Sequence, residues 1–241
     1  MKKMNSATVA WAALIIAVIA LIKCIACCVS MKSGSSVEAA LMAKPEIIVN
    51  AMQNFEQKMR DEAVAQAKKL IEEHIENINN NPRSPVLGNP NGSIVLAEFF
   101  DFACGYCQRL RPAIKNIIKN NPEVKFVAKE LSFVSPASNY AARAALAAHK
   151  QGKYEQMYDA LLSLGVPLTE AKVDEIARSI GLDMAKFKAD VDSQEIHDTV
   201  RENNELAGKI QIQGVPTIVL NGEMIQTIDE SVLQEAINAL K

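Results

Sequence analysis

Apolar and polar residues follow three different patterns along the chain. An apolar run extends from Ala7 to Ile22, behind two lysines near the start of the chain. Between residues 45 and 80, apolar residues recur every three or four positions, which predicts a helix with one apolar face. From residue 92 onward, short apolar runs and longer segments of helical spacing follow one another, which is typical of an α/β fold.

The first segment has the arrangement of an export signal, because Lys2 and Lys3 precede the apolar run. The run is shorter than the roughly 20 apolar residues that a full membrane span needs. Three cysteines follow it directly: Cys24, Cys27 and Cys28. Residues 1–31 are therefore predicted to be a cleaved signal peptide, or an anchor, either uncleaved or lipid-modified, that holds the chain to a membrane through residues 7–28. Either alternative places the body of the chain in the periplasm or cell envelope.

The helix predicted at 45–80 must cover its apolar face with a partner. That face consists of Ile48, Met52, Phe55, Met59, Ala63, Ala67, Ile71, Ile75 and Ile78. The helix can lie on the following domain, or it can associate with other copies of the chain. We favour the second alternative, so that residues 32–80 form a linker and an oligomerisation arm. The small and polar residues from Met31 to Ala43 suit the linker.

The remaining segments predict strands on both sides of a helical block. Residues 92–102 and 124–131 are apolar runs that predict buried strands, with a helix between them. Residues 135–212 have only helical spacing, divided by Gly, Pro and capping residues. A hairpin that turns at Asn221-Gly222 and a last helix capped by Asp229 complete the chain. The order is thus a βαβ start, a helical insertion and a ββα finish.

Cys104 and Cys107 lie where the first of these strands meets its helix, and they are the only cysteines beyond the leader. A disulfide across two intervening residues would constrain little of the unfolded chain. Thiol-disulfide exchange, by contrast, needs an attacking thiolate, a second thiol and access, and a helix start favours the thiolate. The pair therefore favours redox chemistry on a thioredoxin-like unit.

Two other interpretations of the pair remain open: a buried, inert pair of thiols and a zinc site. Zinc sites usually have four ligands, and the only histidines, His74, His149 and His197, fall on separate predicted helices. A second CxxC, formed by Cys24 and Cys27, lies inside the leader.

Composition restricts the class of partner. The chain has 26 basic and 28 acidic residues, a net charge of -2, and no strongly basic segment. Phosphate binding needs clustered Lys and Arg, so nucleic acid is not an expected partner.

Val215-Pro216 follows Gly214 at the start of an apolar run. A proline here either forms a cis peptide bond that bends the chain, or opens an edge strand in the trans form. Glu98 presents a similar choice, because an acid on the first strand can be buried or can face outward.

The stretch EFFDFACGYC, followed about 110 residues later by GVPTIVLNG, resembles the DsbA-like branch of the thioredoxin superfamily. The resemblance covers about residues 84–241. It implies a thioredoxin fold, formed by residues 81–134 and 213–241, with residues 135–212 as an inserted helical domain and a helical stalk in front.

The resemblance also implies roles for single residues. Cys104 would be the nucleophile and Cys107 the resolving thiol, with no cofactor beyond the disulfide between them and no metal. Pro216 would be cis and face that disulfide, with Val215 beside the substrate backbone. Glu98 matches the buried acid of the family, and as such it would carry protons for Cys107.

The chain departs from the monomeric oxidases of the family in two ways. Gly105 and Tyr106 between the cysteines resemble the disulfide isomerases, and they predict a less extreme thiolate than a Pro-His dipeptide. The helix at 45–80 resembles the oligomerising arms of the isomerases and of the ScsC-like and Com1-like subgroups. Together they imply an exported, homo-oligomeric disulfide isomerase or reductase that acts on exported cysteine-containing proteins and exchanges electrons with a membrane redox partner. The alternatives are a DsbA-type oxidase and a thiol-based metal-binding protein.

Overall fold

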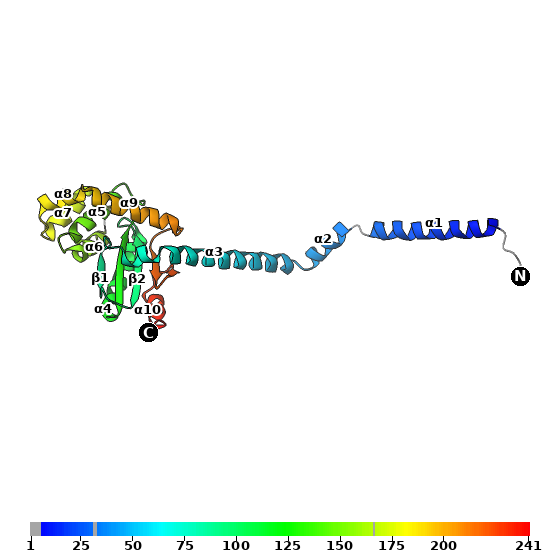
Figure 1. Ribbon diagram of the computed structural model, residues 1–241, viewed down its shortest axis with the longest axis horizontal. Coiled ribbons are helices and arrows are strands. Elements are labelled where there is room, and N and C mark those ends of the chain that lie inside the picture. Colours follow the sequence, from blue (N-terminus) through cyan, green and yellow to red (C-terminus); the bar gives the residue numbers. More distant parts are fainter. Residues whose placement is uncertain (1–5, 31–32, 166) are drawn as a thin grey trace. The chain divides into compact units, whose positions relative to one another are not determined.

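The computed structural model describes residues 6–30, 33–165 and 167–241, and it divides into two compact units, Met1–Glu62 and Ala63–Lys241. The first unit holds α1 (Ser6–Ser30), α2 (Ser33–Ala43) and the beginning of α3 (Glu46–Asn80) (Figure 1). Among the described residues, no helix combines the length and apolar character that a membrane crossing requires. The lysines that begin the predicted leader, Lys2 and Lys3, lie outside the described residues, as does Met31.

The helix α2 differs from the expected linker. The segment contains Ser and Gly at its beginning, but Glu38, Leu41, Met42 and three alanines follow. Glu, Leu, Met and Ala have high intrinsic helix propensity. The small and polar residues of the segment had suggested a linker instead.

The second unit contains a five-stranded sheet in the order β1-β3-β2-β4-β5. Its strands are β1 (Val86–Gly88), β2 (Ile94–Phe100), β3 (Val124–Glu130), β4 (Thr217–Leu220) and β5 (Glu223–Ile225). β2 and β3 are parallel, joined by α4 (Gly105–Asn120), and the other neighbours are antiparallel. The hairpin turns at Asn221 and Gly222, both with positive φ, and α10 (Glu230–Asn238) ends the chain with Asp229 as its N-cap.

These elements confirm the predicted α/β thioredoxin fold, βαβ…ββα, with a helical insertion. The edge strand β1 was not predicted, because three residues carry no readable alternation. Five helices lie between β3 and β4, and Figure 1 shows them gathered together on one side of the strands: α5 (Ser138–His149), α6 (Tyr154–Leu162), α7 (Glu170–Ser179), α8 (Met184–Val191) and α9 (Gln194–Lys209).

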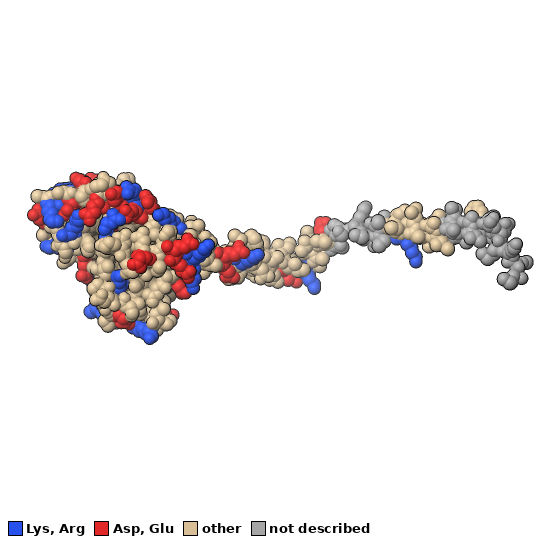
Figure 2. Space-filling model, viewed as in Figure 1, with Lys and Arg blue, Asp and Glu red and all other residues tan. Residues whose placement is uncertain are grey.

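Alanines make α5 the centre of this insertion. Six of them are buried along the helix: Ala141, Ala142, Ala144, Ala145, Ala147 and Ala148. Their small side chains allow the neighbouring helices to approach closely, and larger buried side chains such as Leu146 and Phe187 complete the core. On the face shown in Figure 2, acidic and basic side chains alternate over the outer helices of the insertion.

The two faces of the sheet are covered by different helices. On one face, Leu96 and Phe100 of β2 pack with α4, α6 and α10. On the other face, Ala97 and Phe99 pack with Ile71 and Ile78 of α3 and with the end of α9. Since side chains alternate along a strand, Glu98 points to the α4 face.

The helix expected at 45–80 forms as α3, and its packing changes along its length. Ile71 and Ile78 are fully buried against the sheet. Lys125 of β3 strengthens this contact through hydrogen bonds to the Asn79 carbonyl and the Asn80 side chain, both at 2.8 Å. The last turns of the helix are therefore part of the core of the second unit.

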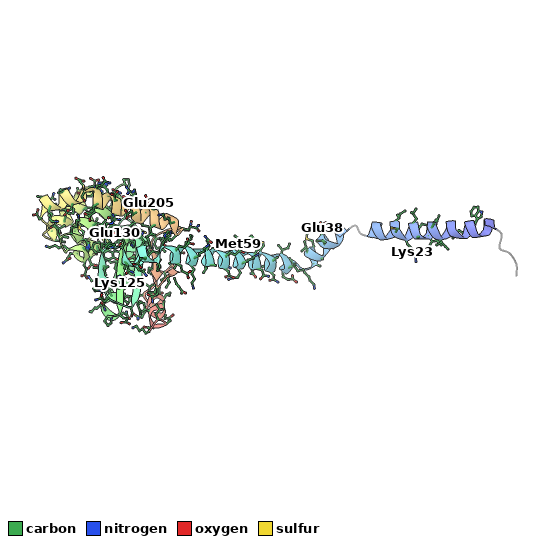
Figure 3. The ribbon with its side chains drawn as sticks, in the orientation of Figure 1. Lys23, Glu38, Met59, Lys125, Glu130 and Glu205 are labelled. Carbon is green, nitrogen blue, oxygen red and sulfur yellow. The ribbon has the colours of Figure 1, made fainter. Side chains whose placement is uncertain are left out.

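The beginning of α3 lies in the first unit, where its apolar residues are exposed. Met52, Phe55 and Met59 are 58%, 65% and 49% exposed, and Met59 projects from the helix in Figure 3. A cavity of about 540 Å³ lies between α2 and this part of α3. Its lining is mainly apolar and includes Leu41, Ile47, Ile48 and Phe55. The apolar face of α3 is thus exposed at the beginning of the helix and packed on the sheet at its end.

Candidate active site

Cys104 and Cys107 are brought together by the start of α4. Cys104 is the N-cap residue and donates its backbone N–H to the Asp101 carbonyl at 2.9 Å. Both cysteines are free thiols. Cys104 remains 8% exposed, whereas Cys107, one turn into the helix, is fully buried. One sulfur is therefore accessible from outside and the other is held behind it.

The two thiols have opposite shifts in pKa. The Cys104 pKa falls from 9.0 to about 6, chiefly because the Cys107 thiol donates a hydrogen bond to its sulfur, while burial acts in the other direction. The N–H groups of Cys107 and Tyr106 lower the pKa further, although neither makes a full capping hydrogen bond. The Cys107 pKa is raised by the same hydrogen bond, by burial and by the charge of Glu98. Cys104 is thus the thiolate near neutral pH.

The peptide bond between Val215 and Pro216 is cis. This is one of the two forms, cis and trans, that the sequence left open. The bond faces the cysteines, because the Val215 carbonyl oxygen lies 3.4 Å from the Cys104 sulfur and can accept a hydrogen bond from the protonated thiol. A cavity of about 280 Å³ lies beside this loop and is lined by Gln213, Gly214, Val215, Pro216, Thr217 and Gln226. An extended substrate segment can approach Cys104 along this loop.

The two residues between the cysteines face outward. Tyr106 is 56% exposed, and the guanidinium carbon of Arg109 lies 4.2 Å from the centre of its ring. This cation–π contact holds the ring at the surface. A Cβ atom on Gly105 would meet no atom within 4 Å, so this position is open to solvent and to a substrate.

Glu98 is fully buried below the cysteines, which excludes the outward-facing alternative. Burial raises its pKa from 4.5 to about 8, a hydrogen bond from Tyr158 partly opposes this shift, and the charge of Cys104 adds to it. The Tyr158 hydroxyl donates to Oε2 of Glu98 at 3.0 Å. A buried acid that titrates near pH 8 is suited to accepting and releasing protons.

Asp101 also contributes to the site, and sequence reasoning missed it. Its carboxylate is fully buried and accepts four hydrogen bonds. The donors are Ala103 N and Ser138 Oγ, at 2.9 and 2.7 Å, and Phe133 N and Val134 N, both at 3.0 Å. The carboxylate joins the turn that carries Cys104 to the beginning of the helical insertion. Its one signal in the sequence is an acid within the apolar stretch FFDFAC.

The three histidines lie on separate helices, α3, α5 and α9. Within the described parts of the chain, no group of three or more His, Cys, Asp or Glu side chains is arranged to hold a metal ion.

Comparison with known proteins agrees with the thioredoxin fold and with the placement of the two cysteines. The model of the DSBA-like thioredoxin domain matches residues 95–238. A thioredoxin-like oxidoreductase from Silicibacter pomeroyi is 34% identical with a TM-score of 0.66, over 68% of this chain and 96% of that chain. BcfH of Salmonella enterica Typhimurium is 26% identical with a TM-score of 0.76, over 90% of this chain and 98% of its own. ScsC of Proteus mirabilis is 25% identical with a TM-score of 0.66, over 85% and 91%.

Among curated proteins, a probable disulfide bond formation protein D of Bacillus anthracis is 27% identical, over 57% of this chain and 70% of that protein. The Na⁺/H⁺ antiporter NhaA 3 of Salinispora tropica is 28% identical over 58% of this chain, but the match spans only 22% of the antiporter. The likeness to the antiporter is therefore confined to one part of that longer protein. The family match, the thioredoxin fold and the placement of Cys104 and Cys107 agree, and the chain belongs to the DSBA-like thioredoxin domain family of thiol-disulfide oxidoreductases.

Proposed function

We propose that this chain is an exported protein thiol-disulfide isomerase or reductase that works as a homo-oligomer. The observation that carries the proposal is the arrangement of Cys104, which has a low pKa, an accessible sulfur and a position beside the cis Val215-Pro216 peptide. In this proposal, residues 81–134 and 213–241 carry the chemistry, and residues 135–212 cover it.

The reaction begins when the Cys104 thiolate attacks one sulfur of a substrate disulfide. A bond forms between Cys104 and that sulfur, the substrate disulfide breaks, and its other sulfur leaves as a thiolate. In isomerisation, a different thiolate of the substrate then attacks the sulfur bound to Cys104. A new substrate disulfide forms and Cys104 is released, so no net oxidation occurs.

In reduction, Cys107 completes the exchange. The Cys107 thiol gives its proton to Glu98, and its sulfur attacks Cys104. The Cys104–Cys107 bond forms, the bond to the substrate breaks, and the electron pair leaves with the substrate sulfur. The substrate gains two electrons and the cysteine pair loses two, which a membrane redox partner returns. No other cofactor takes part.

Exposed apolar residues support self-association through the beginning of α3. Met52, Phe55 and Met59 form a row at helical spacing, and all three side chains are exposed among the described residues. A second copy of the chain, with the same row, would cover it. An isomerase benefits from this assembly because two active sites then face one misfolded substrate. The matches to BcfH and ScsC extend over 90% and 85% of this chain, more than residues 84–241 alone can supply, so each includes part of the chain in front of residue 84.

One observation favours a second activity, oxidation of reduced substrates. A Cys104 pKa of about 6 stabilises the dithiol form at neutral pH, and this makes the disulfide form more oxidising. A substrate thiolate would attack Cys104 of the disulfide, and Cys107 would leave and take a proton from Glu98. A second substrate thiolate would then attack the sulfur bound to Cys104, so that the substrate disulfide forms and the Cys104 thiolate leaves. The basic and apolar leader supports export, which both activities need.

Reactivation of a scrambled disulfide protein in a glutathione buffer tests the proposal. The variant with Phe55→Glu and Met59→Glu is compared with a control variant that carries Gln53→Glu and Asn54→Glu. Both pairs are exposed and change the charge equally. We expect the wild type and the control to be oligomeric and to reactivate the substrate. We expect the first variant to be monomeric and to lose at least half of this activity. If the wild type is monomeric and only oxidises reduced substrates, the isomerase proposal is wrong and the chain is an oxidase.

A further inference from the structure

We propose that Tyr158, supplied by the helical insertion, is a positioning residue for Glu98 and sets which of its oxygens exchanges a proton with Cys107. The inference rests on the proposed role of Glu98 in the reaction. It assigns the insertion a part in the chemistry, in addition to covering the thioredoxin fold.

The hydrogen bonds of Glu98 distinguish its two oxygens. Oε2 accepts the Tyr158 hydroxyl at 3.0 Å. Oε1 is buried and has no hydrogen-bond partner among the described residues. A buried acceptor without a partner is uncommon and costly, and active sites are one place where it occurs. Because Tyr158 occupies Oε2, Oε1 is the atom that is free to take a proton.

The ring of Tyr158 is held on several sides. The rings of Phe100, Phe102 and Phe126 meet it edge to face, with centroid distances of 5.3, 6.4 and 5.9 Å. The ring of Tyr154 stacks on it at 6.0 Å. This packing leaves the hydroxyl little freedom of direction, so it fixes the carboxylate that it contacts.

Tyr158 affects the protonation of Glu98 without exchanging a proton itself. Its pKa is raised well above 10.0 by burial and by the neighbouring charge of Glu98, so it remains a hydrogen-bond donor. A donor favours the charged carboxylate and opposes the effect of burial. Of the other titratable groups near Glu98, Cys104 at the N-cap of α4 raises the Glu98 pKa. The charge of Glu98 in turn raises the pKa values of Cys107 on α4 and of Tyr154 on α6.

In the resolving step, the Cys107 proton moves to Oε1 of Glu98 while the Cys107 sulfur attacks Cys104. The Cys104–Cys107 bond forms, and the substrate sulfur leaves with the electron pair of its former bond to Cys104. Tyr158 keeps its proton throughout, and its hydrogen bond to Oε2 lowers the cost of the charged form of Glu98 before the step.

Tyr154 provides a matched control. It lies one turn earlier on α6, is also buried, and donates a hydrogen bond to a different buried acid, Glu130. Figure 3 labels Glu130, at the end of β3. Loss of either hydroxyl removes one hydrogen bond to a buried acid, but only Tyr158→Phe removes it from Glu98.

The experiment measures the pKa of Glu98 directly, by ¹³C NMR of the reduced protein labelled at the glutamate carboxyl carbons, with Glu98→Gln to assign the signal. We expect Tyr158→Phe to raise this pKa by about one unit, since the loss of a hydrogen-bond donor disfavours the charged carboxylate. We expect Tyr154→Phe to leave it within about 0.3 units of the wild-type value. A second variant, with 3-fluorotyrosine in place of the tyrosines, keeps the rings and provides a stronger donor, so it should lower the Glu98 pKa.

Kinetics then connect the titration to the reaction. A small aromatic thiol is attached to Cys104 as a mixed disulfide, and its release by Cys107 is followed against pH. The midpoint should move upward in Tyr158→Phe by the same amount as the Glu98 pKa. An unchanged Glu98 pKa in folded Tyr158→Phe, or an equal shift in Tyr154→Phe, would overturn the inference. Absence of thiol release in the wild type would instead count against the proposed function, because the NMR titration does not depend on activity.

Discussion

At the scale of single residues, one hydrogen bond separates the properties of the two cysteines. The Cys107 thiol donates to the Cys104 sulfur, which lowers the pKa of one group and raises that of the other. Burial alone would raise both values, since it disfavours any thiolate. The asymmetry therefore comes from the direction of this bond and from the position of Cys104 at the start of α4.

Replacement of Cys107 tests this bond. Cys107→Ala removes the donor, so the Cys104 pKa should rise from about 6 toward 9.0. Cys107→Ser keeps a hydroxyl that can donate, so its value should stay closer to that of the wild type. The rate of Cys104 alkylation against pH, followed by peptide mapping, measures both. An equal midpoint in the wild type and in Cys107→Ala would show that the bond does not control the thiolate.

Glu98 should make stability depend on pH. Its pKa is about 8 in the folded protein and 4.5 when it is unperturbed. The folded protein keeps the proton between these values and the unfolded chain releases it, so stability falls as pH rises through this window. Glu98→Gln removes the effect. We expect the reduced wild type to lose up to about 5 kcal/mol relative to this variant between pH 4.5 and 9. Urea unfolding at both pH values measures the difference in unfolding free energy between the two proteins. If this difference is the same at both pH values, the pKa of Glu98 is not raised in the folded protein.

The reactive residues were predictable from the sequence, but their supporting partners were not. Cys104, Cys107 and the loop around Pro216 have local signatures, because CxxC and a proline at a strand start are uncommon patterns. Asp101 and Tyr158 have no such signature. Apart from Ala103, which is two positions from Asp101, their hydrogen-bond partners lie 32 to 60 positions away along the chain, so only the fold brings them together.

At the scale of elements, the turn before α4 depends on the loop before α5. The Asp101 carboxylate is the link, since its four donors come from both segments. Asp101→Asn leaves one acceptor oxygen and places an amide NH₂ against backbone N–H donors. We expect a loss of about 2–4 kcal/mol of unfolding free energy, compared with about 1 kcal/mol for Ser138→Ala. Urea unfolding compares the two variants, and equal losses would argue against the link.

Elements with a clear periodicity were predicted from the sequence, including β2, β3, the hairpin and the helices of the insertion. The elements that were missed are short or of mixed composition. β1 has three residues and exists because it pairs with β3, and α2 forms where a linker was expected. Strand pairing cannot be recognised from a local pattern alone. The helix formers of α2 follow a Ser- and Gly-containing start that resembles a linker.

At the scale of the whole molecule, the apolar stripe of α3 lies in two environments, one buried and one exposed, that its sequence did not separate. Spacing alone gives one continuous face from Ile48 to Ile78. The structure divides that face, because Ile71 and Ile78 belong to the core of the second unit while Met52 and Phe55 are exposed in the first. The boundary depends on contacts with strands that come later in the chain, so no local rule predicts it.

Two truncations test this division. Removal of residues 1–62 should leave the unfolding free energy of the remaining protein within about 1 kcal/mol, because it ends where the second compact unit begins. Removal of residues 1–80 also takes away two fully buried isoleucines and should cost well over 4 kcal/mol. Thermal and urea unfolding compare the two proteins. Equal stability of both would mean that the whole of α3 is separate from the core.

Trapping of the mixed disulfide is the most direct test of Cys104 as the nucleophile of thiol-disulfide exchange. Cys107→Ser and Cys104→Ser proteins are each incubated with a substrate that contains a disulfide, and covalent adducts are identified by mass spectrometry under non-reducing conditions. We expect Cys107→Ser to accumulate an adduct through Cys104, because the resolving thiol is absent. We expect Cys104→Ser to accumulate none. Equal adduct formation by the two variants, or none by Cys107→Ser, would contradict the assignment of Cys104 as the nucleophile of a thiol-disulfide exchange protein.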